Sequence, residues 1–493
     1  MVSHYYFRSI LFIIVTFVNG SRQNTLLLGL SGCPQLGCNP SGGFSFTGNL
    51  PLSNVTVRWQ NDEGGQADST DFGCIGTTER IVCPLRAPNS TLMGLDTQNG
   101  KLVWHSNLLH FPRMPLIDIY SDTIACDGSL LVPYDSEGNL RGTPIPFTPS
   151  MNPVFSLSLT DNDAFIISGY DGKLVTYLTD GVIHASIFLK ANIDGVNGTF
   201  VPIVTPVVAG HRAYFLTHFR PDTRGHKSKD VLPVFRLYAV DILRQAVDRM
   251  KIIWFHTFKN KSYASNHETK YSQTNKNSNK QNCVVTKGTR VFVTLNAKSL
   301  DGLIDGKQLV NNPVNYPYLT NSDQSETLLY GFNDTGLSYD ILFSDTKPFV
   351  ALSATIDVSD DSVNFWAATN SSIYKINGLN GQELAKFNLA SIFGEPVILT
   401  SKLMVVKKVG TSEGILILIA VSCVEEHCKF SGTQKHFVCL IDVNTKKLLW
   451  AVETPEDRAV KGQLIGMSSS NEHESKDLIV ASAEGIIFAI AGY

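Results

Sequence analysis

The chain has 493 residues, of which 43% are hydrophobic and 17% are charged, a composition that can bury a large core and excludes a chain disordered throughout. The 41 Lys and Arg residues against 44 Asp and Glu residues give a formal net charge of −3, so charge gives no reason to expect nucleic acid as a partner. The 38 glycines and 27 phenylalanines favour a β-rich protein with many turns.

Residues 1–20 have the organisation of a secretory signal peptide. Arg8 lies in a short polar start, residues 9–18 form an apolar run (SILFIIVTFV), and the small residues Val18 and Gly20 precede a suitable cleavage point. The alternative is a membrane anchor, but this run is too short to cross about 30 Å of hydrocarbon. We therefore expect a secreted, extracellular protein with no membrane span after cleavage.

Entry into the secretory pathway permits disulfides. Nine cysteines are an odd number, so at least one is unpaired or pairs between chains. Two short loops suggest a pair between Cys33 and Cys38 and a second pair between Cys74 and Cys83. No Cys-x2-Cys pair exists, so the spacing does not favour zinc. The connectivity of the others stays open: Cys126, Cys283, Cys423, Cys428 and Cys439.

Six Asn-x-Ser/Thr sequons predict a glycoprotein if the chain is secreted. The chain is rich in Asn, Ser and Thr, so chance alone would give roughly this many. The candidate glycosylation sites are Asn54, Asn89, Asn197, Asn260, Asn333 and Asn370.

One hairpin pattern recurs along the chain. Its clearest copy is residues 92–104 (LMGLDTQNGKLVW), in which an alternating strand ends at an Asp, a turn follows, and a second strand ends at a Trp. Residues 439–450 (CLIDVNTKKLLW) keep the same Asp-to-Trp spacing of eight. Residues 373–382 keep the turn, but Ala385 stands where the tryptophan would be. Residues 237–241 match the first half, and a longer turn delays the tryptophan.

The physics of this pattern is that of a β-hairpin between two neighbouring sheets. Alternation with a period of two directs one face of each strand inward. Asp96 can accept hydrogen bonds from the backbone of its own turn, and Gly100 tolerates the positive φ that the turn requires. The Trp that ends the second strand can cover the gap to the next sheet with a large apolar surface.

The two ends of the chain complement each other. Residues 54–59 (NVTVRW) form a Trp-bearing strand with no hairpin before it, and residues 477–490 form a hairpin with no Trp-bearing strand after it. Pairing them completes a last blade and closes a ring, which removes exposed sheet edges. We therefore predict an all-β fold, an eight-bladed β-propeller closed by its N-terminal strand, with seven blades as the alternative.

The predicted organisation follows from these repeats. Residues 1–20 are the signal peptide, residues 21–53 an N-terminal extension with a short disulfide loop, and residues 54–493 the propeller, with a polar insertion at 259–282. The tryptophan at position 366 lies outside the pattern, so we expect no docking role for it. The expected blade-docking residues are Trp59, Trp104, Trp254 and Trp450. The expected blades are 68–104, 105–147, 148–188, 189–258, 283–345, 346–388, 389–451, and 452–493 with 54–60.

The segments 92–104 and 439–450 resemble the Trp-docking repeats of the quinoprotein alcohol dehydrogenase-like (PQQ-repeat) β-propeller family. The resemblance implies the fold, while the activity stays open because the family contains enzymes and non-catalytic assembly scaffolds. Its dehydrogenases hold pyrroloquinoline quinone and calcium, with an Asp base and commonly a disulfide between adjacent cysteines. This sequence has no adjacent cysteine pair, and no Glu, Asn or Asp aligns with the calcium ligands. No catalytic, cofactor-binding or metal-binding residue is carried over.

One segment concentrates basic groups of the kinds that bind anions or transfer protons. His211 and Arg212, residues 218–222 and residues 224–229 bring His, Arg and Lys together after a predicted strand. Such a loop can bind an anionic ligand or position a general base, but an exposed basic loop is the interpretation we favour. The acidic turns 135–139 and 357–361 lack the pattern of a calcium loop, and we expect them to be solvated.

We therefore expect a secreted propeller that recognises a protein or glycan ligand, or acts as a scaffold, through its faces and loops. We expect no cofactor. The alternative is an oxidoreductase, a divergent quinoprotein dehydrogenase, or another enzyme that uses the central funnel. A cluster of carboxylate, Asn and His side chains at one funnel mouth would favour the enzyme.

Overall fold

The structure, a computed structural model, describes most of the chain between residues 32 and 492. The predicted signal peptide and the insertion 259–282 lie outside the described residues. No helix in this part of the chain is long and apolar enough to cross a membrane. The described ranges are 32–63, 73–87, 90–110, 112, 114–118, 120–127, 130–146, 158–159, 166–170, 172–178, 182–222, 234–243, 249–258, 283–296, 327–346, 349, 351–354, 363–408, 415–423, 435–460, 462–467 and 477–492.

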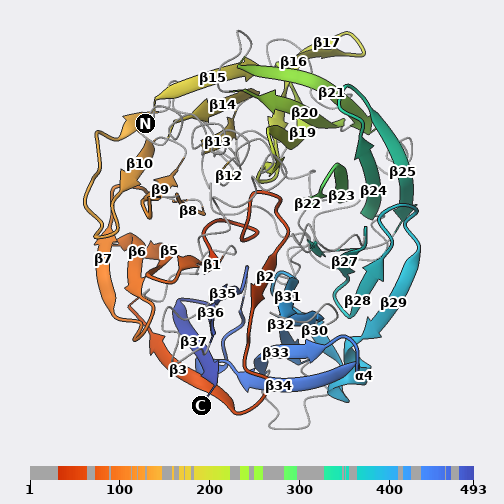
Figure 1. Ribbon diagram of the computed structural model, residues 1–493. Coiled ribbons are helices and arrows are strands. Elements are labelled where there is room, and N and C mark those ends of the chain that lie inside the picture. Colours follow the sequence, from red (N-terminus) through yellow and green to blue (C-terminus); the bar gives the residue numbers. More distant parts are fainter. Residues whose placement is uncertain are drawn as a thin grey trace, which may run out of the picture.

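Eight β-sheets follow one another around a ring, which we number 1 to 8 in chain order (Figure 1). In every sheet except sheet 4, the first strand lies toward the ring centre and the last toward the rim; the two strands that begin sheet 4 lie near the rim. Sheet 1 contains β4 (Ile75–Thr77), β5 (Arg80–Ala87), β6 (Ser90–Asp96) and β7 (Leu102–Ser106). Sheet 2 contains β8 (Leu116–Ile117), β9 (Thr123–Cys126), β10 (Leu130–Tyr134) and β11 (Ile145–Pro146). Sheet 3 contains β12 (Ser158–Leu159), β13 (Ile166–Tyr170), β14 (Lys173–Tyr177) and β15 (Ile183–Phe188).

Sheet 4 contains β16 (Lys190–Ile193), β17 (Val196–Pro202), β18 (Val207–Ala209), β19 (Arg212–Pro221), β20 (Phe235–Ile242) and β21 (Met250–Phe258). It is enlarged because β16 and β17 form an extra hairpin, which pairs with the second half of the long strand β19. Sheet 5 contains β22 (Cys283–Lys287), β23 (Arg290–Asn296), β24 (Thr327–Asp334) and β25 (Tyr339–Thr346). Sheet 6 contains β26 (Ala351–Ser353), β27 (Phe365–Ala368), β28 (Ser372–Ile376) and β29 (Glu383–Asn388).

Sheets 7 and 8 complete the ring. Sheet 7 contains β30 (Val397–Leu399), β31 (Met404–Lys408), β32 (Ile415–Cys423), β33 (His436–Asp442) and β34 (Lys447–Glu453). Sheet 8 contains β35 (Ile465–Met467), β36 (Leu478–Ala483), β37 (Ile486–Gly492) and β3 (Val55–Asn61). The helical elements of the described ranges are α4 (Leu389–Phe393) and a 3-10 turn (Pro455–Asp457).

The predicted all-β propeller and its mode of closure are confirmed. β3 pairs antiparallel with β37, so that Val55 lies opposite Gly492 and Asn61 lies opposite Ile487. The first Trp-bearing strand therefore forms the outer strand of the last sheet. Each of the eight predicted spans corresponds to one of the eight sheets, although β25, β34 and β3 end one or two residues past the predicted limits.

A shared β-bulge fixes the docking position on the rim. In seven sheets the register of the outermost strand pair shifts by one residue, and the same position follows the shift each time. A bulge re-aims the side chain beside it, so the repeated bulge directs this position alike in each sheet. The residues at this position are Trp59, Trp104, Ala185, Trp254, Phe343, Ala385 and Trp450.

The aromatic residues at this position lie against a turn of the next sheet. Trp59 donates from Nε1 to the carbonyl of Thr97, 3.2 Å away, and its ring lies against Gly100. Gly100 has a φ of 69°, and a Cβ there would overlap the Trp59 ring. The turn therefore needs glycine for its backbone conformation and for the space that the tryptophan occupies.

The same arrangement recurs around the ring with different partners. Trp104 lies against Gly138, and Phe343 lies against Gly381, both glycines with positive φ. Trp254 packs on Tyr339 of the next sheet, with ring centroids 4.7 Å apart. The Trp450 Nε1 donates to the carbonyl of Pro51, 2.8 Å away.

The acidic and amide residues of the pattern stabilise these turns from within. Asp96 Oδ1 accepts from the backbone N–H of Gln98 at 2.8 Å and of Asn99 at 3.1 Å. An Asp or Asn side chain that accepts hydrogen bonds from the backbone of its own turn forms an Asx turn, which stabilises the reversal of chain direction in the hairpin. Equivalent bonds are made by Asp135, Asp334, Asn377 and Asp442.

Trp366 is not at the docking position, which lies on the outermost strands, but it also packs between two sheets. Trp366 lies on β27, is almost fully buried, and belongs to an apolar cluster shared by sheets 6 and 7. Its ring centroid lies 5.9 Å from that of Phe387. Because Ala385 has no ring at the docking position, these two residues supply the aromatic surface between the two sheets.

Replacing a docking tryptophan should destabilise the ring. We expect Trp104→Ala, Trp450→Ala and Trp366→Ala each to lower the free energy of unfolding by about 3–5 kcal/mol, as for other buried aromatic residues. Leu337→Ala is the control, because that side chain is 87% exposed, and it should change stability by less than about 0.5 kcal/mol. Denaturant unfolding measures all four. Equal stabilities would contradict the docking role.

Candidate functional site

The centre of the ring is occupied by residues 32–50 of the same chain, which we call the central segment. Figure 1 shows it in red, running through the middle of the ring between β1 and β2. β1 (Gly32–Cys33) pairs antiparallel with β4 of sheet 1, and β2 (Ser45–Gly48) pairs parallel with β31 of sheet 7. The segment thus adds a strand to the inner edge of two sheets that lie on different sides of the ring.

Between its two strands the central segment binds the inner strands of further sheets. Its carbonyl groups accept backbone hydrogen bonds from sheets 2, 4, 5, 6 and 7 in the order of the chain. The pairs are Ile117 N to Pro34 O (2.7 Å), Val208 N to Pro40 O (2.7 Å), Thr286 N to Ser41 O (3.0 Å), Ala354 N to Gly43 O (2.8 Å) and Val405 N to Phe44 O (3.0 Å).

Gln463 connects sheet 8 to the central segment and to sheet 1. Its Oε1 accepts from the backbone N–H of Gly37 at 2.9 Å, and its Nε2 donates to the carbonyl of Cys74 at 2.7 Å. The side chain is fully buried. With this contact the central segment touches seven of the eight sheets, and the last and first sheets are joined at the ring centre as well as at the rim.

Both predicted cysteine pairs are disulfides in the structure. Cys33 and Cys38 close a loop inside the central segment, and Cys74 and Cys83 join residues of sheet 1. Cys423 is disulfide-bonded as well, and Cys439 is a buried thiol whose pKa is raised by burial. The second disulfide includes the residue whose carbonyl Gln463 binds, so it stabilises the neighbourhood of that contact.

The residues at the ring centre do not fit a quinone and its cation. Amide and hydroxyl groups at the ring centre bind the central segment itself: Asn39 Oδ1 accepts from the backbone N–H of Gly43 at 3.2 Å, and Ser353 Oγ donates to the same glycine's carbonyl at 2.8 Å. Within the described ranges, no group of three or more His, Cys, Asp and Glu side chains could hold a metal ion. The inner strands bind the chain's own backbone where a funnel enzyme would bind its cofactor.

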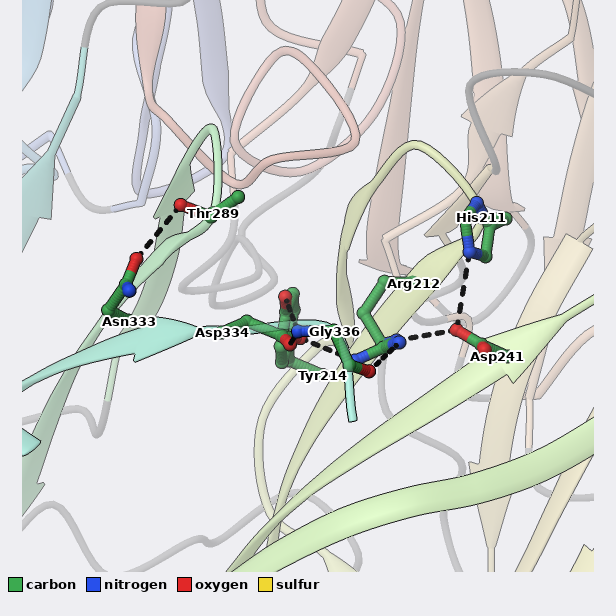
Figure 2. A network of polar contacts seen from close by, with 8 residues as sticks. All are labelled: His211, Arg212, Tyr214, Asp241, Thr289, Asn333, Asp334 and Gly336. Atoms are coloured by element: carbon green, nitrogen blue, oxygen red, sulfur yellow. Dashed lines mark hydrogen bonds and ion pairs between the residues drawn. The ribbon is translucent and has the colours of Figure 1, made fainter. Parts of the chain in front are cut away.

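A buried ionic network links sheets 4 and 5 (Figure 2). Arg212 donates from Nε to Asp241 Oδ1 at 2.5 Å, from Nη1 to Asp334 Oδ2 at 2.5 Å, and from Nη2 to the carbonyl of Gly336 at 2.8 Å. Tyr214 OH also donates to Asp334 Oδ2, at 2.8 Å. Every nitrogen of the guanidinium has a protein acceptor, so this cluster holds two sheets together rather than offering a group to a ligand.

The electrostatics of the network agree with a structural role. Burial alone would lower the pKa of Arg212, but the hydrogen bond to Asp241 and the charges of both carboxylates raise it above its usual value. Burial, followed by the charge of Asp334, raises the pKa of Tyr214 well above its usual value. Tyr214 therefore stays a hydrogen-bond donor to Asp334.

The structure does not bring the basic residues of the sequence into one site. Arg212 begins β19 and His211 lies in the turn just before it, where His211 Nε2 is 3.5 Å from Asp241 Oδ1. His218 lies further along the strand, where burial lowers its pKa to about 4. Residues 224–229 lie outside the described ranges. A shared general-base or anion site is therefore not formed by the described members.

The other predicted positions are spread over the surface. Asn54 and Asn197 are exposed, Asn333 and Asn370 are half-buried, and Asn89 and Asn260 lie outside the described residues. The acidic turn 135–139 is closed by Asp135, which accepts from the backbone of its own turn, and residues 357–361 are not described.

Sequence reasoning missed the central segment, although a signal was present. Residues 32–50 contain no charged residue in a chain that is 17% charged, and five of them are glycines: Gly32, Gly37, Gly42, Gly43 and Gly48. A segment without charges can be buried without leaving ions unpaired, and glycine permits close approach of two backbones. Those two features together indicate a buried segment rather than an exposed extension.

Comparisons with known proteins support the fold. No protein-family model and no curated protein matches the sequence. Among solved structures, a europium-containing methanol dehydrogenase superimposes with a TM-score of 0.53 at 9% identity, over 94% of this chain and 98% of that chain. BamB from Moraxella catarrhalis has a TM-score of 0.45 at 10% identity, over 89% of this chain and 99% of that chain. At this identity, the likeness to the methanol dehydrogenase shows a shared fold and nothing of activity.

Asp118 makes the stability of the ring pH-dependent. It follows the inner strand β8, is fully buried, and has an Oδ2 without a hydrogen-bond partner among the described residues. Burial raises its pKa to about 6, against the hydrogen bond from Tyr120 N–H and the charge of Arg141. A carboxyl with a raised pKa destabilises the folded state when it ionises, so stability should fall as pH rises from about 4 through about 6.

Asp118→Asn should remove this dependence. The free energy of unfolding of the variant minus that of the native protein should increase by about 1–3 kcal/mol between pH 4.5 and pH 7.5. Denaturant unfolding at both pH values measures the difference, and comparing the two differences cancels any fixed cost of the amide. A difference that is constant, or that decreases with pH, would contradict a raised pKa.

Proposed function

We propose that this protein is a secreted β-propeller that recognises a partner non-covalently or acts as a scaffold through its faces and loops. One observation carries the proposal: the central segment is bound to the inner strands of seven sheets. Substrate chemistry in the funnel would require this segment to leave. The outer surface of the propeller stays available to a partner.

The cost of emptying the funnel would be large. The central segment is mostly buried, including both half-cystines and the two aromatic side chains Phe44 and Phe46. Leaving would strip partners from backbone groups of several inner strands, and each buried group without a partner costs about 1–3 kcal/mol. In such an enzyme, the state with the central segment bound would therefore be more stable than the state with an empty funnel by many kcal/mol.

The secretory setting is part of the proposal. Disulfides persist in oxidising compartments, and the chain has both predicted pairs together with exposed sequons at Asn54 and Asn197. The apolar run at residues 9–18 fits the hydrophobic region of a signal peptide, which would direct the chain into the secretory pathway.

The rival function is a divergent quinoprotein dehydrogenase, which the fold of the methanol dehydrogenase motivates. We expect the purified protein, incubated with pyrroloquinoline quinone and either calcium or europium, to reduce no dye with methanol, other alcohols or sugars. We also expect no metal-dependent increase in melting temperature, because a ligand of the native state alone would stabilise it. A known quinoprotein dehydrogenase reconstituted in parallel is the control.

Substrate-dependent dye reduction that chelation abolishes would overturn the proposal. So would a thermal shift that needs quinone and metal together, because it would show that the ring centre opens to a cofactor.

A further inference from the structure

The outer rim carries an exposed aromatic residue where the chain passes from sheet 3 to sheet 4. β15 ends at Phe188, the buried Leu189 follows, and β16 begins at Lys190. The Leu189 N–H donates to the carbonyl of Gly172 at 2.6 Å, and its carbonyl accepts from Phe200 N–H at 2.9 Å. Phe188 is thus held on an anchored backbone, with its side chain 57% exposed.

Two ammonium groups flank the Phe188 ring. Lys173 lies opposite Phe188 on β14, with its Nζ 5.5 Å from the ring centroid, and Lys190 Nζ lies 5.8 Å from it. Among the described residues, neither lysine has a carboxylate within ion-pair distance. We call Lys173, Phe188 and Lys190 the Phe188 patch.

The neighbourhood of the patch is basic. Lys190, Thr199 and Arg220 lie in one row across three paired strands, β16, β17 and β19. Residues 148–258, which include sheets 3 and 4, contain 11 Lys and Arg against nine Asp and no Glu, a net charge of +2 in a chain of net charge −3. The part of the chain that builds sheets 3 and 4 is therefore mildly basic, although the chain as a whole is acidic.

Other lysines of the molecule also lie over aromatic rings, and they differ from those of the Phe188 patch. Lys375 lies over Trp366 and Lys386 over Tyr374, and both rings are buried. Such lysines cover a core residue with their apolar stems. At Phe188 the ring itself is exposed and two cations share it, so covering the core does not account for the arrangement.

We infer that the Phe188 patch binds an anionic polysaccharide, an inference that rests on the proposed recognition function and names its ligand class. The apolar C–H face of a sugar ring can stack on Phe188, while its carboxylate or sulfate groups pair with the ammonium groups of Lys173 and Lys190. Phe188 projects from a rim strand, whereas anchor residues of protein interfaces pack in desolvated pockets. A flat projecting ring beside cations favours a sugar polymer over an acidic protein segment.

The test measures binding of the full-length secreted chain to four polymers at about 150 mM salt, where screening weakens non-specific attraction. Dextran sulfate and polygalacturonate distinguish sulfate from uronate, dextran tests the uncharged sugar, and polyglutamate tests an acidic peptide. We expect binding to at least one anionic polysaccharide and none to dextran or polyglutamate.

Variants locate the site. Phe188→Ala, and separately Lys173→Ala with Lys190→Ala, should each weaken polysaccharide binding about tenfold. Lys375→Ala with Lys386→Ala removes the same charge from sheet 6 and should leave binding unchanged. Melting temperatures show that each variant is folded.

The outcomes separate this inference from the proposed function. Equal weakening by the patch and the sheet 6 variants would overturn the inference, because it would indicate general attraction to the charge of the molecule. Patch-dependent binding of polyglutamate alone would replace the polysaccharide by an acidic protein. If the native protein binds none of the polymers, the inference is overturned. The proposed recognition function would still stand, because a partner could bind another surface, and the quinone experiment tests that function separately.

Discussion

The innermost strands of a propeller are sheet edges, and their backbone N–H and C=O groups face the ring centre. Buried backbone groups must be paired, so the centre has to hold water, a ligand or more chain. Here the chain supplies the partner: residues 32–50 bind at the inner edges of seven of the eight sheets. The rest of the architecture depends on this pairing, because it joins sheets that otherwise contact only their neighbours.

The rim is held by a different device. In seven of the eight sheets a bulge in the outermost strand pair fixes the direction of one side chain. Where that residue is aromatic it lies against the neighbouring part of the chain, and in several places a glycine in a turn of the next sheet leaves room for the ring. Where alanine replaces the aromatic residue, as at Ala385, aromatic residues from neighbouring positions provide the packing. Ring closure uses both devices, with β3 on β37 at the rim and Gln463 at the centre.

The fold was predictable because the docking pattern is local. The spacing from Asp96 to Trp104 specifies a hairpin, and its repetition specifies a ring. The role of residues 32–50 was not predictable in that way, since its contacts join positions up to 428 residues apart, as between Gln35 and Gln463. Closeness in sequence likewise does not place the two histidines in one site, because His211 precedes the long strand β19 and His218 lies well along it.

Because residues 32–50 fill the ring centre, the proposed recognition uses the outside of the ring. The most direct test that the centre is filled is hydrogen–deuterium exchange of the native protein, with peptides covering residues 32–50 compared with those of β5 and β32. The account predicts that the central segment exchanges as slowly as these strands, because its backbone is paired inside the ring. Exchange within seconds, as for an exposed extension, would show that the centre is open and would contradict the account.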